Sequence, residues 1–232
     1  MQTVYVETEW DPRDPVGEMR YVARLRRASG LPTVAVAQAW LDRDDLASTL
    51  AALARFDFVR GIRHKPRAGQ MADPRWRAGF KLLAQRGLRF DLQAPWTLLE
   101  EAAQLARAFP DARIVLNHTG LPGDRSREGV AGWKEALRAL AACPNVALKI
   151  SGLGVPGQAW TAQANREVVL AALDIFGIGR AMFASNFPVD GLCASFEAIV
   201  TGMREIMRGF TADEQRAFFH DNAIRIYHME QG

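Results

Sequence analysis

The sequence predicts an α/β fold of the (β/α)8 barrel type, with parallel strands around an interior and helices outside them. Short apolar and β-branched runs recur about every 30 residues, and amphipathic helical patterns lie between them. The chain has 232 residues, close to the roughly 250 that such barrels take. Because no Ser/Gly/Pro-rich linker or shift in composition divides the sequence, we expect one domain over residues 1–232.

Seven runs are expected to be strands. In chain order they are Thr3–Glu9, Thr33–Ala39, Phe58–His64, Leu88–Gln93, Arg113–His118, Val146–Ser151 and Ala181–Asn186. Stretches such as EEAAQLARAFP and GWKEALRALAACP place apolar residues three and four positions apart and have Gly or Pro near their ends, which indicates crossover helices. Seven strands are one short of closure, so either a strand goes unrecognised, or the chain lacks a unit, or the sheet is open with two free edges.

Composition and charge exclude several classes of protein. A hydrophobic content of 49% with 24% charged residues is typical of a globular fold and not of a disordered chain or coiled coil. The net charge is only +3, and its charges are interspersed, so the sequence offers no basic face for nucleic acid. Free sheet edges would favour association, which makes a homo-oligomer one expectation.

The two cysteines and the N-terminus indicate a cellular location. Cys143 and Cys193 lie far apart in no metal-like spacing, which disfavours a disulfide framework or a cysteine zinc site. The first residues, MQTVYVETEW, contain no signal-peptide pattern, and no apolar stretch is long enough to cross a bilayer. We therefore expect a cytoplasmic protein without a membrane partner.

Polar residues alternate with apolar ones near the ends of three predicted strands. Since successive side chains of a strand point to opposite faces and the helix-facing side should be apolar, we expect these polar residues to point into the interior. The carboxyl ends of barrel strands are where such enzymes carry their chemistry. The residues concerned are Glu7, Glu9, Asp91, Gln93, Lys149 and Ser151.

Two further strand ends carry groups suited to chemistry. His118 ends the fifth run in LNHTGLP, where a neutral imidazole could ligate a metal or polarise a carbonyl group. The stretch GIRHKP places Arg63, His64 and Lys65 in a row, and any of them at the mouth would favour an anionic substrate or a developing oxyanion. Alternation alone does not decide which of the three faces inward.

Lys149 lies within an otherwise apolar strand, VALKIS, and has two interpretations. It could pair with Glu7, Glu9 or Asp91 across the interior or contact substrate. Alternatively, a desolvated amine could form a Schiff base with a carbonyl substrate.

The segment GLGVPG, Gly152–Gly157, matches the dinucleotide-binding pattern G-x-G-x-x-G only in its letters. Pro156 interrupts it, the following helix is expected to begin near Thr161, and the segment lies late in the chain. We therefore expect no nucleotide cofactor.

Several of these segments together resemble a known family. FVRGIRH, IVLNHTGLP, VALKISGLG, MFASNFP and the closing HDNAIRIY resemble, in order and spacing, the amidohydrolase family 2 enzymes. These are TIM-barrel hydrolases that include sugar lactonases and 2-pyrone-4,6-dicarboxylate lactonase. By this resemblance Thr3–Glu9 is the second barrel strand and Ala181–Asn186 the eighth. The family's first strand, with its His-x-His pair, has no counterpart before Met1, so an N-terminally incomplete barrel is expected.

The resemblance also implies roles for individual residues. His118 corresponds to the family's active-site histidine, with a divalent metal such as zinc or manganese as its partner, although some family lactonases work without metal. The family's Ser-Asp-Trp-Pro segment reads Ser185–Pro188 here, with Asn186 in place of the aspartate. An asparagine can orient or donate but cannot take a proton, so the general base is expected among Glu7, Asp91 and Asp190.

The resulting expectation is a hydrolase that opens a small lactone or related ester by water attack. The expected catalytic residues are His118, Asn186, Asp190 and Glu7. The expected contacts to a small anionic or polyhydroxylated substrate are Arg63, His64, Lys65, Asp91, Gln93, Lys149 and Glu9. The alternatives are a Schiff-base lyase that uses Lys149 and a degenerate barrel that only binds a small anionic ligand.

Overall fold

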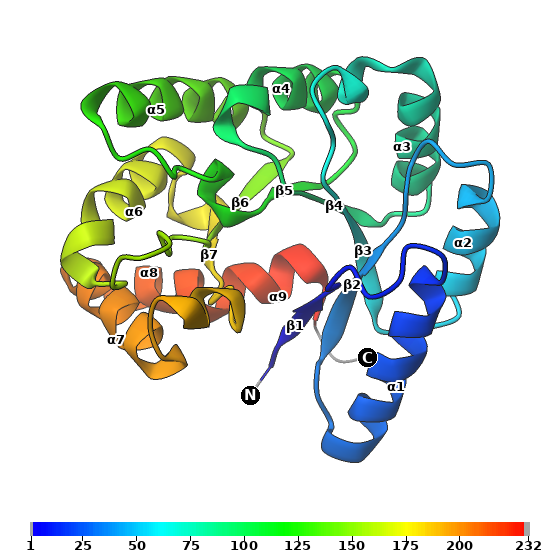
Figure 1. Cartoon of the computed structure of the whole chain (residues 1–232), viewed down its shortest axis with the longest axis horizontal. Helices are drawn as coiled ribbons and strands as arrows, with labels where there is room; N and C mark the ends of the chain where they lie inside the picture. The colour runs from blue at the N-terminus through cyan, green and yellow to red at the C-terminus, as the bar shows by residue number, and fades with distance from the viewer. Residues whose placement is uncertain (1, 230–232) are drawn as a thin grey trace.

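The computed structural model describes residues 2–229, and its centre is a curled parallel sheet. All seven predicted strands are present, in the spatial order β1-β2-β3-β4-β5-β6-β7 (Figure 1). Their bounds are Val4–Val6, Val34–Gln38, Val59–His64, Arg89–Leu92, Ile114–Leu116, Val146–Ile150 and Ala181–Phe183. Within the described residues β1 and β7 do not pair, so the sheet curls as an incomplete barrel with two edges.

Helices lie outside the sheet and follow the strands in sequence (Figure 1). They are α1 Pro15–Ser29, α2 Leu46–Leu53, α3 Pro74–Gln85, α4 Leu99–Ala108, α5 Arg127–Ala141, α6 Ala162–Phe176, α7 Phe196–Ile206, α8 Ala212–Arg216 and α9 Asn222–Tyr227. A one-turn π-helix over Ala217–Asp221 joins α8 to α9. No helix in the described range is long and apolar enough to cross a membrane.

Local signals set the helix ends. The side chain of Thr161 accepts a hydrogen bond from the Ala164 amide at the start of α6, so this helix begins where the sequence predicts and not at the GLGVPG glycines. Pro15 and Pro74 begin α1 and α3, where a proline costs no helical hydrogen bond. Gly30 takes a left-handed conformation with φ of 75° and ends α1.

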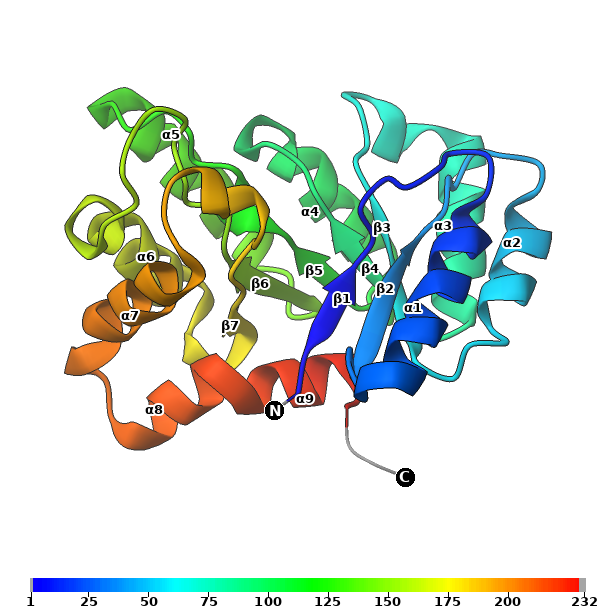
Figure 2. The same ribbon diagram turned by 60° about the horizontal axis from the view of Figure 1, so that its bottom comes forward.

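Two apolar clusters divide the core. The larger packs the outer side of the sheet against the surrounding helices and includes Trp76, Phe80 and Trp133. The smaller fills the interior near the amino ends of the strands. It joins Val36, Val115 and other strand residues to Tyr227 of α9. Figure 2 shows α8 and α9 running beneath the sheet at this end, so the C-terminal helix forms the floor of the interior.

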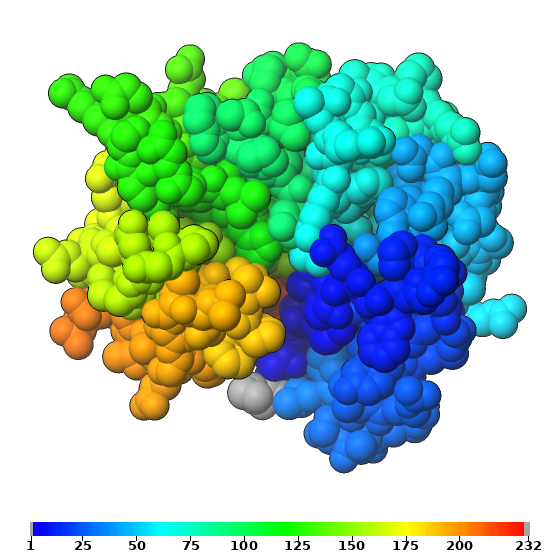
Figure 3. Space-filling view, viewed as in Figure 1, coloured from blue at the N-terminus to red at the C-terminus, as the bar shows by residue number. Residues whose placement is uncertain are grey.

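The strands are shorter than the sequence predicts, and the difference concerns their carboxyl ends. β1 ends at Val6 and β7 at Phe183, each three residues before the predicted end, and β5 ends at Leu116, two residues before it. Beyond these strand ends the backbone takes left-handed conformations at Glu9, His118 and Asn186, with which a strand cannot continue. The site residues therefore lie on loops that follow the strands. Figure 3 shows the face on which these loops gather, from the blue N-terminal segment round to the yellow-orange segment after β7.

Candidate functional site

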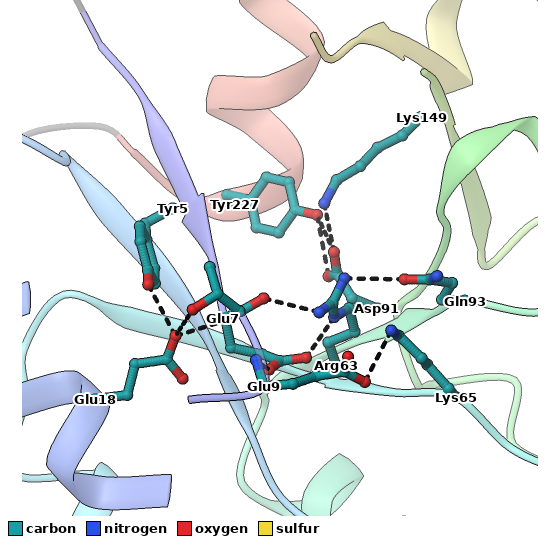
Figure 4. Close-up of polar contacts among 11 residues, drawn as sticks. Tyr5, Glu7, Glu9, Glu18, Arg63, Lys65, Asp91, Gln93, Lys149 and Tyr227 are labelled. Carbon is teal, nitrogen blue, oxygen red and sulfur yellow. Dashed lines mark hydrogen bonds and ion pairs between the residues drawn. The ribbon is translucent and has the colours of Figure 1, made fainter. Parts of the chain in front are cut away.

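Glu7 and Arg63 form a buried ion pair at the carboxyl ends of β1 and β3. Arg63 Nε lies 2.5 Å from Glu7 Oε1, and Arg63 Nη2 donates to the Glu7 carbonyl oxygen at 2.8 Å (Figure 4). Arg63 Nη1 donates to Gln93 Oε1 at 2.9 Å. The guanidinium is therefore bound on three sides, and both predicted contact residues, Arg63 and Gln93, belong to one network.

Glu7 does reach the interior, but not because of the alternation of side chains along β1. Val4 and Val6 point into the interior, whereas Tyr5 donates a hydrogen bond to Glu18 of α1 on the outer side. Glu7 has the parity of Tyr5 and would point outward in a longer strand. It reaches Arg63 because β1 ends at Val6 and the chain turns inward there.

Glu9 and Lys65 form a second ion pair at the rim. Lys65 Nζ lies 2.8 Å from Glu9 Oε1, and both side chains are about half exposed. The bond from Lys65 lowers the pKa of Glu9 below its usual value. This pair faces solvent and is held less tightly than the pair of Glu7 and Arg63.

His64 lies apart from these residues. It shares the parity of Ile62, which packs against the helices, and its ring lies 6.0 Å from that of Trp76 on α3. Burial lowers the pKa of His64 to about 4, so the ring is neutral near pH 7. Of the three adjacent basic residues, Arg63 and Lys65 lie among the loops at the carboxyl ends of the strands, and His64 faces α3.

Asp91, Lys149 and Tyr227 form a buried network between β4, β6 and α9 (Figure 4). Lys149 Nζ lies 2.5 Å from Asp91 Oδ2, and the Tyr227 hydroxyl donates to the same carboxylate at 2.9 Å. Burial, followed by the charge of Asp91, raises the pKa of Tyr227 well above its usual value. Lys149 is thus an ion-paired ammonium, the first of its two expected roles, and the network presents no free amine.

His118 is held by an unusual loop. His118, Thr119, Gly120 and Leu121 all have φ between 54° and 72°, and such a run of left-handed residues is costly without support. The Thr119 hydroxyl supplies support by donating to the Ser151 carbonyl oxygen at 3.0 Å, and His118 Nδ1 lies 3.0 Å from Ser151 Oγ. The loop after β5 is in this way fastened to the end of β6.

Burial and neighbouring charge keep His118 neutral. Burial lowers the pKa of its imidazole to about 3, and the positive charges of Lys149, Arg63 and Lys65 act in the same direction. Arg63 and Lys65 lie at the end of β3, and Lys149 lies in β6. A neutral imidazole in this place can donate one hydrogen bond and accept another.

Asn186 and Asp190 form a linked pair on the loop after β7. Asn186 Nδ2 donates to Asp190 Oδ1 at 2.8 Å, and the Gly154 amide approaches Asp190 Oδ2 at 3.3 Å. Burial raises the pKa of Asp190, and the bond from Asn186 offsets this only in part. Unlike Glu7 and Asp91, this carboxylate has no ion-pair partner within the described residues.

Two glycines of one loop lie against His118 and Asp190. A Cβ atom at Gly152 would lie 2.6 Å from His118 Cβ, and one at Gly154 would lie 3.2 Å from Asp190 Oδ1. Because these glycines are two residues apart, the imidazole and the carboxylate border the same short segment.

The residues of this region do not form a metal site. Among residues 2–229 no group of three or more His, Cys, Asp and Glu side chains is placed to hold an ion. His118 Nδ1 contacts Ser151, and the nearby carboxylates of Glu7 and Asp91 are bound by Arg63 and Lys149. The described donor set therefore does not fit the metal that the family resemblance implies.

Sequence reasoning missed three side chains of this region. Gln38 and Asn117 follow the inward-facing Val36 and Val115 by two residues, so the same alternation could have found them. The amide oxygens of both side chains are buried without a hydrogen-bond partner. Tyr227 carried no comparable signal, because it reaches Asp91 from 136 residues away.

Comparisons with known proteins agree on one family. The family model described as amidohydrolase matches residues 2–229. An uncharacterized protein, y4mH, of Sinorhizobium fredii is 39% identical over 99% of this chain and 81% of its own length. An L-fucono-1,5-lactonase of Burkholderia ambifaria is 30% identical over 92% of this chain and 77% of its own.

Solved structures agree on the fold. A zinc-bound amidohydrolase of Burkholderia multivorans superposes with a TM-score of 0.86 and 25% identity, over 98% of this chain and 83% of that one. A putative 2-pyrone-4,6-dicarboxylic acid hydrolase of Pseudomonas putida gives a TM-score of 0.77 over 99% of this chain and 82% of that one. At 22% identity the second likeness supports the barrel architecture alone.

Proposed function

Because the chain belongs to the amidohydrolase family, we propose that it is a hydrolase that opens the ring of a small lactone by water attack. The observation that carries this proposal is the neutral His118, held in its left-handed loop beside Gly152, with Asp190 beside Gly154 of the same loop. The 30% identity to an L-fucono-1,5-lactonase supports a lactone as the substrate.

His118 is the proposed electrophilic group. We assign His118 the tautomer in which the Ser151 hydroxyl, 3.0 Å away, donates to Nδ1 and the proton lies on Nε2, where it can donate to the substrate carbonyl oxygen. A neutral donor of this kind stabilises the oxyanion that forms when water adds to the carbonyl carbon.

Asp190 is the proposed general base. It takes a proton from the attacking water as the new carbon–oxygen bond forms, and the bond from the acyl carbon to the ring oxygen then breaks. The proton passes to the departing alkoxide, which gives the open hydroxy acid. Asp190 suits this role because its contacts are hydrogen bonds from neutral groups and its pKa is raised, whereas Glu7 and Asp91 are bound by cations.

The test is a panel of five- and six-membered lactones assayed by acid release in a weakly buffered pH indicator. We expect ring opening of at least one six-membered lactone at a rate proportional to enzyme concentration, with and without a chelator. If no lactone of the panel opens faster than in buffer alone, the proposed activity is wrong.

A further inference from the structure

The loop that carries His118 begins where the pairing of β5 with β6 stops. The last paired residues are Leu116 and Leu148, and the same register continued along both segments would place Thr119 opposite Ser151. Backbone pairing does not reach that position, because His118 and Thr119 have φ of 55° and 57°, with which a strand cannot continue. The backbone N–H and C=O of the buried Ser151 therefore need another partner on this side.

The hydroxyl group of Thr119 is that partner. Thr119 Oγ1 donates to the Ser151 carbonyl oxygen at 3.0 Å and accepts from the Ser151 amide at 3.3 Å. One side-chain oxygen thus takes both roles that two backbone groups would take in a longer β5. A β-branched residue rarely adopts a positive φ, and these two buried hydrogen bonds offset the cost of that conformation at Thr119.

The carbonyl oxygen of Thr119 is bound from the helix side. Trp133 of α5 is fully buried, and its Nε1 donates to this oxygen at 2.8 Å. Gly120 lies against the same indole, since a Cβ atom at Gly120 would lie 3.8 Å from Trp133 Nε1. Thr119 is therefore held by β6 through its side chain and by α5 through its backbone.

His64 shows that burial at a strand end does not by itself fix an imidazole. β3 continues regularly through His64, which pairs with Leu92 of β4. The Nδ1 atom of His64 is buried without a hydrogen-bond partner. At His118, by contrast, the strand has already ended, and Nδ1 lies 3.0 Å from Ser151 Oγ. The anchored ring therefore accompanies the left-handed loop.

We propose that Thr119 and Trp133 are positioning residues of His118. Thr119 binds the backbone of Ser151, and His118, the residue before it, meets the side chain of the same serine. One hydroxyl group and one indole N–H thus set the place and the tautomer of the imidazole. The orientation of this ring can be measured without a substrate, and only its effect on the rate rests on the proposed hydrolysis.

The first test separates the hydroxyl of Thr119 from the shape of its side chain. Thr119→Val keeps the branching but removes the hydroxyl, whereas Thr119→Ser keeps the hydroxyl. We expect Thr119→Val to lower kcat on the best lactone by at least about tenfold with KM changed less than about twofold, because a displaced oxyanion donor weakens the transition state. Thr119→Ser should recover most of that loss. Equal kcat values in the two folded variants would overturn the role of the hydroxyl.

The second test observes the imidazole without turnover. Nitrogen NMR shifts report which ring nitrogen carries the proton, and a comparison with His118→Asn assigns the signals of His118. We expect one tautomer in wild type and in Thr119→Ser, and a mixture in Thr119→Val, where the contact with Ser151 is loosened. Unchanged His118 signals in Thr119→Val would contradict the proposal. If the signals change although the wild type opens no lactone, the positioning role stands and the proposed reaction fails.

The third test removes the indole donor, and it decides the proposal even if Thr119→Val does not fold. The matched control for Trp133→Phe is Trp76→Phe, because Trp76 is equally buried in the same core and its Nε1 has no hydrogen-bond partner. Both variants should lower Tm through lost packing. Only Trp133→Phe should change the His118 signals and lower kcat, by about three- to tenfold, the value of one neutral hydrogen bond. Equal effects of both variants on kcat and on these signals would assign the loss to ring volume and reject a positioning role for the indole N–H.

Discussion

At the scale of single residues, the site depends on which groups are charged. Asp190 must be ionised to take a proton, and its pKa is raised by burial, so the rate of lactone opening should fall as pH drops through that raised pKa. His118, with a pKa of about 3, stays neutral and should add no inflection near pH 6.5. The measurement is kcat/KM against pH.

The Asp190→Asn variant separates the base from other titrations. We expect a loss of about 100-fold or more, in the range of one general base, and a residual rate without the acid limb. Circular dichroism and the melting temperature verify that the variant folds. An acid limb that persists in Asp190→Asn would assign the base to another group.

The absence of a side chain at Gly152 leaves room for the side chain of His118. Its φ is 61°, and an added Cβ would meet His118 Cβ at 2.6 Å. Gly152→Ala should therefore lower kcat by displacing the imidazole and destabilise the fold by more than about 1 kcal/mol. Gly157→Ala is the matched control, because Gly157 has a similar φ of 78° with nothing within 4 Å. Equal effects of both variants would show that backbone strain alone is responsible.

His64 should make the fold sensitive to acid. Its pKa is about 4 in the folded protein against 6.5 for the free residue, so its contribution is present above pH 6.5 and is lost as pH falls toward 4. Between pH 7 and 5 the loss is about 2 kcal/mol.

Urea unfolding at the two pH values measures this contribution. His64→Phe should lose about 2 kcal/mol less than wild type between pH 7 and 5. His220→Gln, at an exposed position, should behave as wild type. No difference between His64→Phe and wild type would mean that His64 is not buried in its neutral form.

At the scale of elements, the C-terminal helix belongs to the site as well as to the core. Tyr227 of α9 reaches through the floor of the interior to Asp91, which in turn holds Lys149. Tyr227→Phe removes a buried donor and should cost about 1–3 kcal/mol of unfolding free energy. Tyr21→Phe, on a partly exposed ring of α1, should cost less than about 0.5 kcal/mol. Equal costs in denaturant unfolding would remove Tyr227 from the network.

The sequence predicted the direction of a side chain correctly where the strand continues regularly through that residue. Asp91 and Lys149 lie inside β4 and β6, so alternation placed both side chains in the interior. The same rule predicted that Glu7 points inward, and Glu7 does reach Arg63, but it does so because β1 ends at Val6, which no local signal marked.

Contacts between distant segments lie beyond such rules. The bond between His118 and Ser151 depends on the register of β5 against β6, and that between Tyr227 and Asp91 depends on where α9 packs. Tertiary packing decides both hydrogen bonds. Patterns within a single segment of the sequence contain no information about it.

At the scale of the whole molecule, the curled sheet gathers loops from all its strands at one end and α9 closes the other. We therefore expect the chemistry at the carboxyl ends of the strands, as in barrel enzymes generally. The central claim is that His118, presented by the loop after β5, stabilises the oxyanion of an opening lactone. Asparagine tolerates the left-handed backbone at this position, so His118→Asn changes the imidazole with little strain.

The most direct test is kcat/KM of wild type and His118→Asn on the best lactone of the panel, with the melting temperature of both proteins measured alongside. We expect a loss of about 100- to 1000-fold at an unchanged melting temperature, the effect of removing one donor to an oxyanion. Activity within about twofold of wild type in a folded His118→Asn protein would contradict the central role of this histidine.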